Sequence, residues 1–144
     1  MSKVKIVNKG VNPLPEYKTP GSSGMDLMAW LEEPLTLESL ERALVPTGLY
    51  IELQPGYEAQ IRPRSGMSIK HGLTLINAVG TIDSDYRGEL RIPVVNLSRE
   101  PFTIHSGDRI AQMIVAPYDR VILQEVDSLE DSDRGEGGFG STGR

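Results

Sequence analysis

The sequence predicts an all-β domain, built as a barrel or a sandwich. About ten short apolar or alternating runs recur along its 144 residues, and turn-forming residues separate them. Ten prolines and fifteen glycines favour many turns, and therefore β structure over a helical bundle. A chain of this length is expected to form one domain with a core large enough to fold alone.

The strand candidates follow from the apolar runs and the turn residues that bound them. The run Tyr57–Arg62 is typical, because Gln54-Pro55-Gly56 predicts a tight turn just before it. Pro93 falls inside another candidate and indicates an edge strand or a bulge there, since proline cannot donate to a ladder. In chain order the candidates are Val4–Val7, Met25–Trp30, Ala43–Val45, Gly48–Leu53, Tyr57–Arg62, Gly72–Ile76, Glu89–Leu97, Phe102–His105, Arg109–Ala116 and Val121–Glu125.

Two segments are candidate short helices. In Leu37–Ala43 apolar residues stand three apart, although Pro34 and Pro46 limit a helix there to a turn or two. Ser65–His71 is also short, with Ser65 as the candidate N-cap and Gly72 as the C-terminal stop.

Three parts are expected along the chain: a β body over residues 1–124, an acidic linker over 125–133 and a glycine-rich end over 134–144. That end carries one aromatic residue, two hydroxyl residues and an arginine at each side. Backbone N–H groups, hydroxyls and guanidinium groups are suited to phosphate, and a lone aromatic to stacking on a planar ring. A mobile lid over a nucleotide and a plain flexible tail are both open on composition alone.

Composition excludes several classes of function. The net charge of −5 gives no basic footprint for duplex nucleic acid, although local arginines can still bind a small phosphate ligand. The absence of cysteine removes disulfides, thiol nucleophiles and Cys-based zinc sites. The start of the chain lacks a signal-peptide core, and no apolar run reaches the length of a membrane span, so a cytoplasmic location is expected.

Four further segments could carry chemistry. Arg62-Pro63-Arg64-Ser65-Gly66 places two arginines and a serine just before the short helix. They either bind a phosphate or form a plain N-cap with solvated arginines. The densest polar cluster runs from Asn77 to Gly88. It holds the amide of Asn77, which could read the edge of a nucleobase, and two carboxylates, Asp83 and Asp85, each a candidate general base or a water-mediated metal contact. The same cluster is also typical of a polar hairpin.

Two more polar residues stand in apolar surroundings. Asp26, within Gly24-Met25-Asp26-Leu27, is either a turn aspartate or a carboxylate that supports a cation through water. Gln112 interrupts the apolar run after Gly107, so it is either buried for stability or faces a ligand.

Taken in order, five segments resemble the five motifs of the homotrimeric dUTPase (dUTP diphosphatase) family. They are residues 24–29, 63–72, 77–88, 107–114 and 134–143, and the resemblance covers almost the whole chain. It implies a jelly-roll-like β-barrel with one short helix and a flexible C-terminal tail that closes over the site. It also implies a homotrimer with shared active sites that uses Mg²⁺ to hydrolyse dUTP to dUMP and pyrophosphate. This reaction would supply dUMP for thymidylate synthesis and keep uracil out of DNA, with no nucleic-acid or membrane partner.

The same resemblance implies the site residues. Asp83 would be the general base that activates water, and Asp26 would support the metal indirectly, through water. Asn77 would pair with uracil, Tyr86 would pack on the deoxyribose, and Phe139 would stack on the base. The remaining substrate-binding candidates are Arg64, Ser65, Gly66, Thr81, Ile82, Arg91, Gln112, Arg134, Ser141 and Thr142. Ser39-Leu40 departs from the Pro-Gly turn common in relatives, so that turn is expected to differ or become helical.

Two alternatives remain beside dUTP hydrolysis. A dCTP deaminase shares the fold, but it resembles this chain only in outline, because its catalytic glutamate has no counterpart in Leu90–Val95. A non-enzymatic nucleotide-binding jelly roll would keep the β pattern without needing Asp83 and the tail together.

Overall fold

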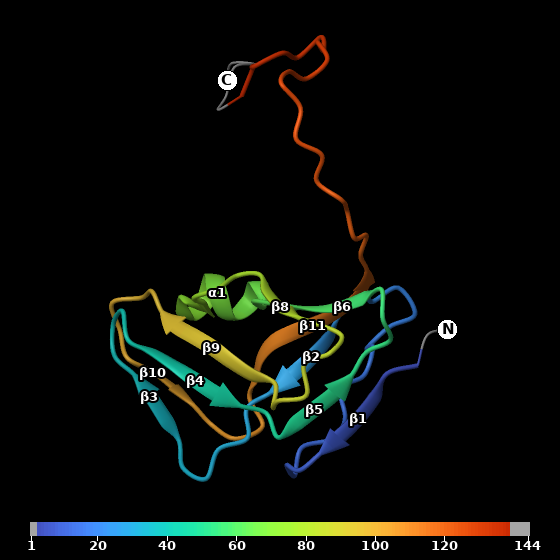
Figure 1. Cartoon of the computed structure of the whole chain (residues 1–144). Coiled ribbons are helices and arrows are strands. Elements are labelled where there is room, and N and C mark those ends of the chain that lie inside the picture. Colours follow the sequence, from blue (N-terminus) through green and yellow to red (C-terminus); the bar gives the residue numbers. More distant parts are fainter. Residues whose placement is uncertain (1–2, 139–144) are drawn as a thin grey trace.

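The computed structural model describes residues 3–138, which form a β body with one short helix (Figure 1). The body is jelly-roll-like, as the sequence predicts. No helix among the described residues is long and apolar enough to cross a membrane. In chain order the elements are β1 (Lys5–Asn8), β2 (Met25–Met28), β3 (Leu35–Leu37), β4 (Arg42–Pro46), β5 (Leu49–Glu52), β6 (Tyr57–Arg62), α1 (Ser65–His71), β7 (Leu73–Leu75), β8 (Gly80–Ile82), β9 (Arg91–Asn96), β10 (Phe102–Ile104) and β11 (Arg109–Pro117).

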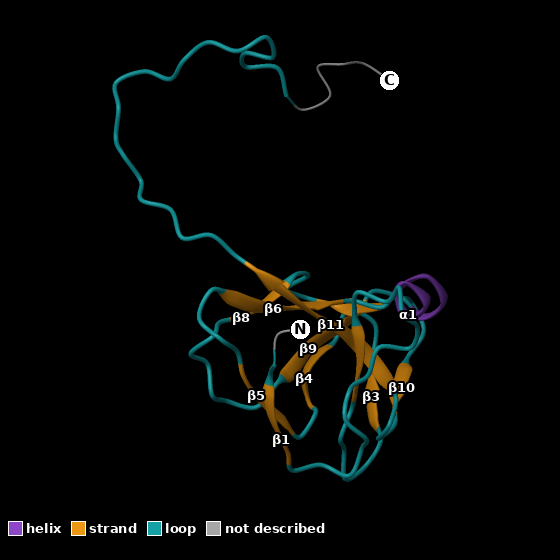
Figure 2. Cartoon of the chain, turned by 90° about the vertical axis from the view of Figure 1, so that its right-hand side faces the viewer, coloured by secondary structure: helices purple, strands orange, loops and turns teal. Residues whose placement is uncertain are grey.

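Four small antiparallel sheets surround one apolar core (Figures 1 and 2). The strand orders are β2-β11-β6-β8, β4-β9-β7, β1-β5 and β10-β3. Alternate residues of these strands point inward, so a single cluster collects side chains such as Leu27, Ile61, Ile92 and Met113. The four-stranded sheet carries most of the candidate site. Its strands β2, β8 and β11 carry residues of three motif-like segments, and β6 leads directly into a fourth at Pro63.

Nine of the ten strand candidates coincide with observed strands. The tenth, Val121–Glu125, is not a strand in the single chain. Its apolar side chains are exposed, and Figure 1 shows the chain leaving the body beyond β11. Strands β3 and β8, of three residues each, were not anticipated.

The helix prediction at Ser65–His71 is confirmed, and its stop at Gly72 has a clear cause. Gly72 has φ 65°, and a Cβ there would stand 2.8 Å from the backbone N of Ser98, so only glycine fits. The predicted cap is wrong. Ser65 is the first helical residue, and Arg64 occupies the N-cap position without a side-chain cap hydrogen bond.

The candidate helix at Leu37–Ala43 is wrong. The segment instead joins β3 to β4 by a tight turn in which Glu41 N donates to Glu38 O. Leu40 sits in this turn with φ 65°, a conformation that costs an L-residue about 1–2 kcal/mol. Pairing of β3 with β10 and of β4 with β9 outweighs the weak helical spacing.

The expectation of an edge or bulge at Pro93 is also wrong. β9 is the central strand of its sheet and pairs with β4 and β7 without a register shift. Pro93 is tolerated because its carbonyl faces Ile76, one residue beyond the end of β7. The nitrogen of Pro93 points to the same side as its carbonyl, toward the chain just beyond β7, where the β7–β9 ladder has already ended.

Candidate active site

An ion pair joins the first and second motif-like segments. Asp26 on β2 accepts a hydrogen bond from Arg64, with 2.8 Å between Oδ1 and Nε. Both side chains are largely shielded from solvent, at 20% and 26% exposure. Arg64 also donates from Nη1 to the backbone oxygen of Arg109, at 3.0 Å, so its guanidinium plane is fixed by contacts on two sides. Its Nη2 has no protein partner within residues 3–138.

The fourth motif-like segment lies beside this pair on β11. Gln112 stands directly across from Asp26 on one side and from Arg62 of β6 on the other. Its Nε2 donates to the carbonyl of Pro63 at 3.0 Å. Gln112 therefore ties down the chain just before Arg64, and its amide is half-buried and hydrogen-bonded.

Arg109 was not anticipated as a site residue. A register shift between Arg109 and Ala111 pairs Arg109 with Met28, on the same face of β2 as Asp26. Without this bulge, the two-residue period of a strand would place Arg109 on the opposite face. The bulge brings Arg109 Nη1 to 3.4 Å from Asp26 Oδ2. No sequence signal marks the extra residue, so the alternation alone could not have found this contact.

Ser65 and Gly66 follow Arg64 as the first two residues of α1, and both are exposed. Apart from its chain neighbours and the backbone of its own helix, nothing lies within 4 Å of where a Gly66 Cβ would stand. Together with Arg64, they present a hydroxyl, backbone N–H groups and a guanidinium at one open place beside Asp26.

The third motif-like segment forms a separate group around β8. Thr81 and Ile82 pair with Gln60 and Ala59 of β6, and Asp83 follows at once as an exposed carboxylate. Tyr86 closes a turn over Asp83, with its backbone N 3.2 Å from the carbonyl of Asp83. Asn77 precedes β8 and lies against Gly80 with its amide exposed.

Arg91 begins β9 and is paired with Glu89, at 2.8 Å between Nε and Oε2. The Glu89 side chain is only 10% exposed and also accepts from the backbone N of Gly48. Burial by itself raises the pKa of Glu89, but the hydrogen bonds from Arg91 and Gly48 and the charge of Arg91 outweigh it and leave that pKa below its ordinary value. Sequence reasoning missed Glu89, because an acid at a strand start is usually a solvated turn residue.

The two groups of polar residues lie at opposite edges of one sheet. Asp26 is on β2, one edge of the order β2-β11-β6-β8, and Thr81 is on β8, the other edge. Three strand spacings separate them, about 14 Å. Within residues 3–138, no hydrogen bond or ion pair joins Asp83 or Tyr86 to Asp26, Arg64 or Gln112.

The glycine-rich end is described only to Gly138. Arg134 forms a local turn there, donating from Nε to the carbonyl of Gly137 at 2.7 Å. Phe139, Ser141 and Thr142 lie outside the described residues. Between Tyr118 and Gly138 there is no strand and no buried residue, and the described part of the tail stays away from the body (Figures 1 and 2).

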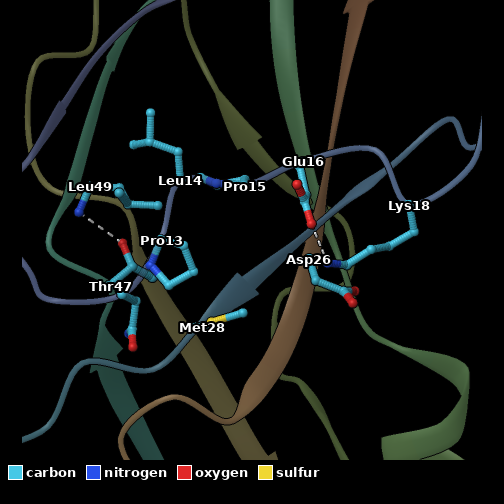
Figure 3. A pocket seen from close by; sticks show the side chains of 10 residues that line it. Pro13, Leu14, Pro15, Glu16, Lys18, Asp26, Met28, Thr47 and Leu49 are labelled. Carbon is cyan, nitrogen blue, oxygen red and sulfur yellow. Dashed lines mark hydrogen bonds and ion pairs between the residues drawn. The ribbon is translucent and has the colours of Figure 1, made fainter.

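A small pocket behind Asp26 is not a nucleotide site. Figure 3 shows it between the N-terminal loop at Pro13–Pro15, Met28 of β2 and the Thr47–Leu49 connection, with Asp26, Glu16 and Lys18 at its polar end. Its free volume of about 30 Å³ suits one water molecule and is far too small for a triphosphate.

The residues near Asp26 fit a metal ion that is coordinated mainly by water and by the phosphates of a bound molecule, and only weakly by the protein. Among residues 3–138, no group of three or more His, Cys, Asp or Glu side chains could hold a metal ion. Mg²⁺ usually keeps several waters and binds one or two carboxylates together with substrate phosphates. Asp26 is a single, partly exposed carboxylate next to two cations, which suits contact with metal-bound water better than direct ligation.

Comparison with known families gives one clear match. The family model described as dUTPase matches residues 12–143. The deoxyuridine 5'-triphosphate nucleotidohydrolase of Finegoldia magna is 64% identical over 141 residues, which cover 98% of this chain and 99% of that protein. The protein of the same name from Cytophaga hutchinsonii is 56% identical, over 98% of this chain and 92% of that protein.

Solved structures agree with the fold. The dUTPase of Staphylococcus bacteriophage 80alpha, in a mutant form with dUpNHpp, superposes with a TM-score of 0.88 at 26% identity and covers 100% of both chains. A mutant dUTPase of S. aureus phage phi11, described as coordinating a structural Mg(II) ion, gives a TM-score of 0.80. It covers 90% of this chain and 99% of that one, and at 22% identity it supports the fold alone.

Proposed function

This chain belongs to the dUTPase family and hydrolyses dUTP to dUMP and pyrophosphate, and we propose that Asp83 is the general base of that reaction. Asp83 is exposed at the end of β8, where its carboxylate can accept a proton from a water molecule. Proton removal makes the water a better nucleophile toward phosphorus. The dCTP deaminase and the non-enzymatic binding module are not favoured, because the close relatives carry the hydrolase name.

The group around Asp26 holds the triphosphate. Within residues 3–138, Arg64 Nη2 has no protein partner and can donate to a phosphate oxygen, while Nε and Nη1 are fixed. Ser65 and Gly66 add a hydroxyl and a close approach of the backbone, and Gln112 orients the segment through Pro63. Fixed donors of this kind stabilise the charge that moves onto the leaving pyrophosphate in the transition state. This arrangement of Asp26, Arg64 and Gln112 is the observation that carries the proposed triphosphate site.

The group around β8 recognises the nucleoside. Asn77 presents an exposed amide that can donate to and accept from uracil. Tyr86 packs on the deoxyribose. Thr81 and Ile82 line the proposed nucleoside site, and Arg91 lies at the border of that site. From the C-terminal segment, Phe139 stacks on the base while Arg134, Ser141 and Thr142 hold phosphates.

A triphosphate would bring Mg²⁺ with it, and Asp26 would hydrogen-bond to the water shell of that ion. The ion neutralises phosphate charge when it is bound. The residues of the chain then align the substrate and the water.

The active enzyme is a homotrimer in which each site is shared between subunits. Two observations support this proposal. In one chain, the residues around Asp26 and the residues around β8 are about 14 Å apart across the sheet. A substrate that must touch both sets is therefore bound more readily when a neighbouring subunit supplies one of them. Moreover, Val121, Ile122 and Leu123 are 73%, 96% and 91% exposed in the single chain. Such an apolar segment is stabilised when its side chains are buried against the surface of another subunit.

A mixing experiment tests the shared site. The variants Asp83→Asn and Arg64→Ala are each expected to be nearly inactive, and co-expression should restore activity. If Asp83 and Arg64 of one site come from different chains, about a quarter of the sites in random mixed trimers carry both native residues. Mixtures with no more activity than either variant would place both residues of a site on one chain.

Substrate choice is tested by pyrophosphate release in the presence of Mg²⁺ from dUTP, dCTP, dTTP and UTP. Release from dUTP alone is expected, with the other three near background. Ammonia release from dCTP would instead favour the deaminase. We also propose that this chemistry takes place in the cytoplasm, where dUMP can serve thymidylate synthesis.

A further inference from the structure

Tyr86 is held in one position, although its side chain is 43% exposed. Its hydroxyl donates a hydrogen bond to the backbone oxygen of Glu89, at 3.0 Å. Its backbone N donates to the carbonyl of Asp83 at 3.2 Å. The ring therefore folds back along its own turn, across Gly88, instead of extending into solvent.

Gly88 leaves the space that this ring occupies. A Cβ on Gly88 would stand 2.2 Å from the Tyr86 hydroxyl oxygen, 2.4 Å from Cζ and 2.9 Å from Cε2. Real Cβ atoms essentially never approach a neighbour within 3.0 Å. The backbone does not itself demand glycine, because Gly88 is absent from the residues with positive φ. The tyrosine ring, rather than the conformation of the chain, is what excludes a side chain here.

The carbonyl that receives the tyrosine hydroxyl is itself anchored. The Glu89 carboxylate accepts from the backbone N of Gly48 at 2.9 Å and from Arg91 at 2.8 Å. The next residue, Leu90, is buried and donates from its backbone N to Leu49 at 2.8 Å. These three contacts fix the end of this loop against the start of β5 and against β9, so the carbonyl that accepts the tyrosine hydrogen bond does not move with the exposed turn.

From these contacts we infer that Gly88 and Glu89 form a seat for Tyr86, and that Gly88 is a positioning residue that sets the preference for deoxyribose over ribose. The inference rests on the proposed role of Tyr86 as the residue that packs on the sugar. Packing alone rejects an added hydroxyl by only about 100-fold, so a small displacement of the ring is enough to remove much of the selectivity. An alanine at position 88 forces such a displacement, because the ring is the part that can move.

The direct test is Gly88→Ala, assayed with dUTP and UTP. The ratio of kcat/KM for dUTP to that for UTP is expected to fall at least about tenfold. Thermal unfolding should change little, because the displaced ring is already exposed. Gly21→Ala is the matched control, since a Cβ at Gly21 meets nothing within 4 Å. It should leave both the ratio and the melting temperature unchanged.

A double-mutant cycle with Tyr86→Ala separates the seat from other effects. Tyr86→Ala alone should lower the ratio, and Gly88→Ala should then add nothing further. If Gly88→Ala lowers the ratio equally with and without the tyrosine, it acts elsewhere and the seat is overturned. If Tyr86→Ala lowers the ratio while Gly88→Ala does not, the role of Tyr86 stands and only the seat fails. If Tyr86→Ala leaves the ratio unchanged, the sugar contact fails and the inference fails with it.

Tyr86→Phe provides a second probe that does not alter Gly88. It removes the hydrogen bond to the Glu89 carbonyl and keeps the ring. A ratio between those of the native protein and Tyr86→Ala is expected. A ratio equal to the native one would show that the carbonyl does not hold the ring.

Discussion

Asp26 and Arg64 lie 38 positions apart in the sequence, yet the carboxylate of one stands 2.8 Å from the guanidinium of the other. The contact links β2 to the segment that leads into α1, and Arg109 approaches the same carboxylate from β11 at 3.4 Å. A carboxylate between two arginines fixes their orientation and offsets part of their mutual repulsion. Under the proposed function, this contact places cations for a phosphate ligand and also stabilises the fold.

Asp26→Asn should therefore affect catalysis more than folding. The amide keeps the shape but loses the charge, so Arg64 is held less firmly and kcat/KM for dUTP is expected to fall about 10- to 100-fold. The free energy of unfolding should drop by about 1–2 kcal/mol, because the pair is only partly buried. The control is Glu52→Gln, which removes a pair of the same 2.8 Å length between exposed side chains. If both variants behave alike, Asp26 has no special part in the reaction.

Asp83→Asn tests the general base. A loss of about 10²- to 10⁴-fold in kcat is expected, with little change in KM, because the proposed role of the carboxylate is on the water and not on substrate binding. The melting temperature should be unchanged, since the side chain is exposed. Asp85→Asn is the matched control, two residues along the same exposed turn, and should remain active. Comparable losses in the two variants would leave the base unassigned.

How far the sequence predicts the molecule depends on the range of the interactions involved. β6 was predicted at both ends, because Gln54-Pro55-Gly56 and Pro63 bound its alternation locally. The helix proposed over Leu37–Ala43 failed, because pairing with distant strands decided the outcome.

The site shows the same division. The segments that hold Asp26, Arg64 and Gln112 were recognised from their motif-like residues, and the structure brings them together. Arg109 was missed, because the bulge that turns it toward Asp26 cannot be recognised from the alternation of apolar and polar residues in the sequence. The support that Glu89 gives to Tyr86 was also missed, since it depends on a backbone contact with Gly48, 41 positions away.

Deleting residues 134–144 should separate catalysis from folding. The described part of the chain beyond Pro117 contributes no strand and no buried residue. The truncated protein is therefore expected to have the same melting temperature as the full-length protein. Its kcat/KM should fall about 100-fold or more, because the groups proposed to close over the nucleotide are lost. A deletion limited to 140–144 is a useful companion, since it keeps Arg134 and Phe139. Normal turnover by the longer deletion would refute the lid.

Leu40→Gly should stabilise the protein. Leu40 is the one non-glycine residue with positive φ among residues 3–138, and its side chain is 71% exposed, so little packing is lost. Relief of about 1–2 kcal/mol of strain exceeds the entropic cost of glycine, about 0.5–1 kcal/mol, and predicts a melting temperature higher by about 3 °C. Leu97→Gly is the control: this leucine is 60% exposed but has no positive φ, and its replacement should destabilise. A lower melting temperature for Leu40→Gly would show that the exposed leucine makes contacts in the assembled enzyme.

The pH dependence of stability should reveal the anchor beneath Tyr86. Burial raises the pKa of Glu89, but hydrogen bonds from Arg91 and Gly48 and the attraction of Arg91 leave it below the ordinary value of 4.5. A carboxyl whose pKa is lower in the folded state contributes stability above its unfolded pKa, and this contribution disappears as the pH falls through the folded pKa. Glu89→Gln should thus be less stable than the native protein by about 1 kcal/mol at pH 7.

The difference between Glu89→Gln and the native protein should shrink as the pH falls below 4.5, in urea unfolding followed at several pH values. Glu52→Gln is again the comparison: its pKa is lowered by a hydrogen bond from Lys5, but the pair is exposed and the change should be smaller. A difference that stays the same from neutral pH to well below the ordinary pKa would mean that the glutamine alters packing and that the charge of Glu89 does not hold the loop.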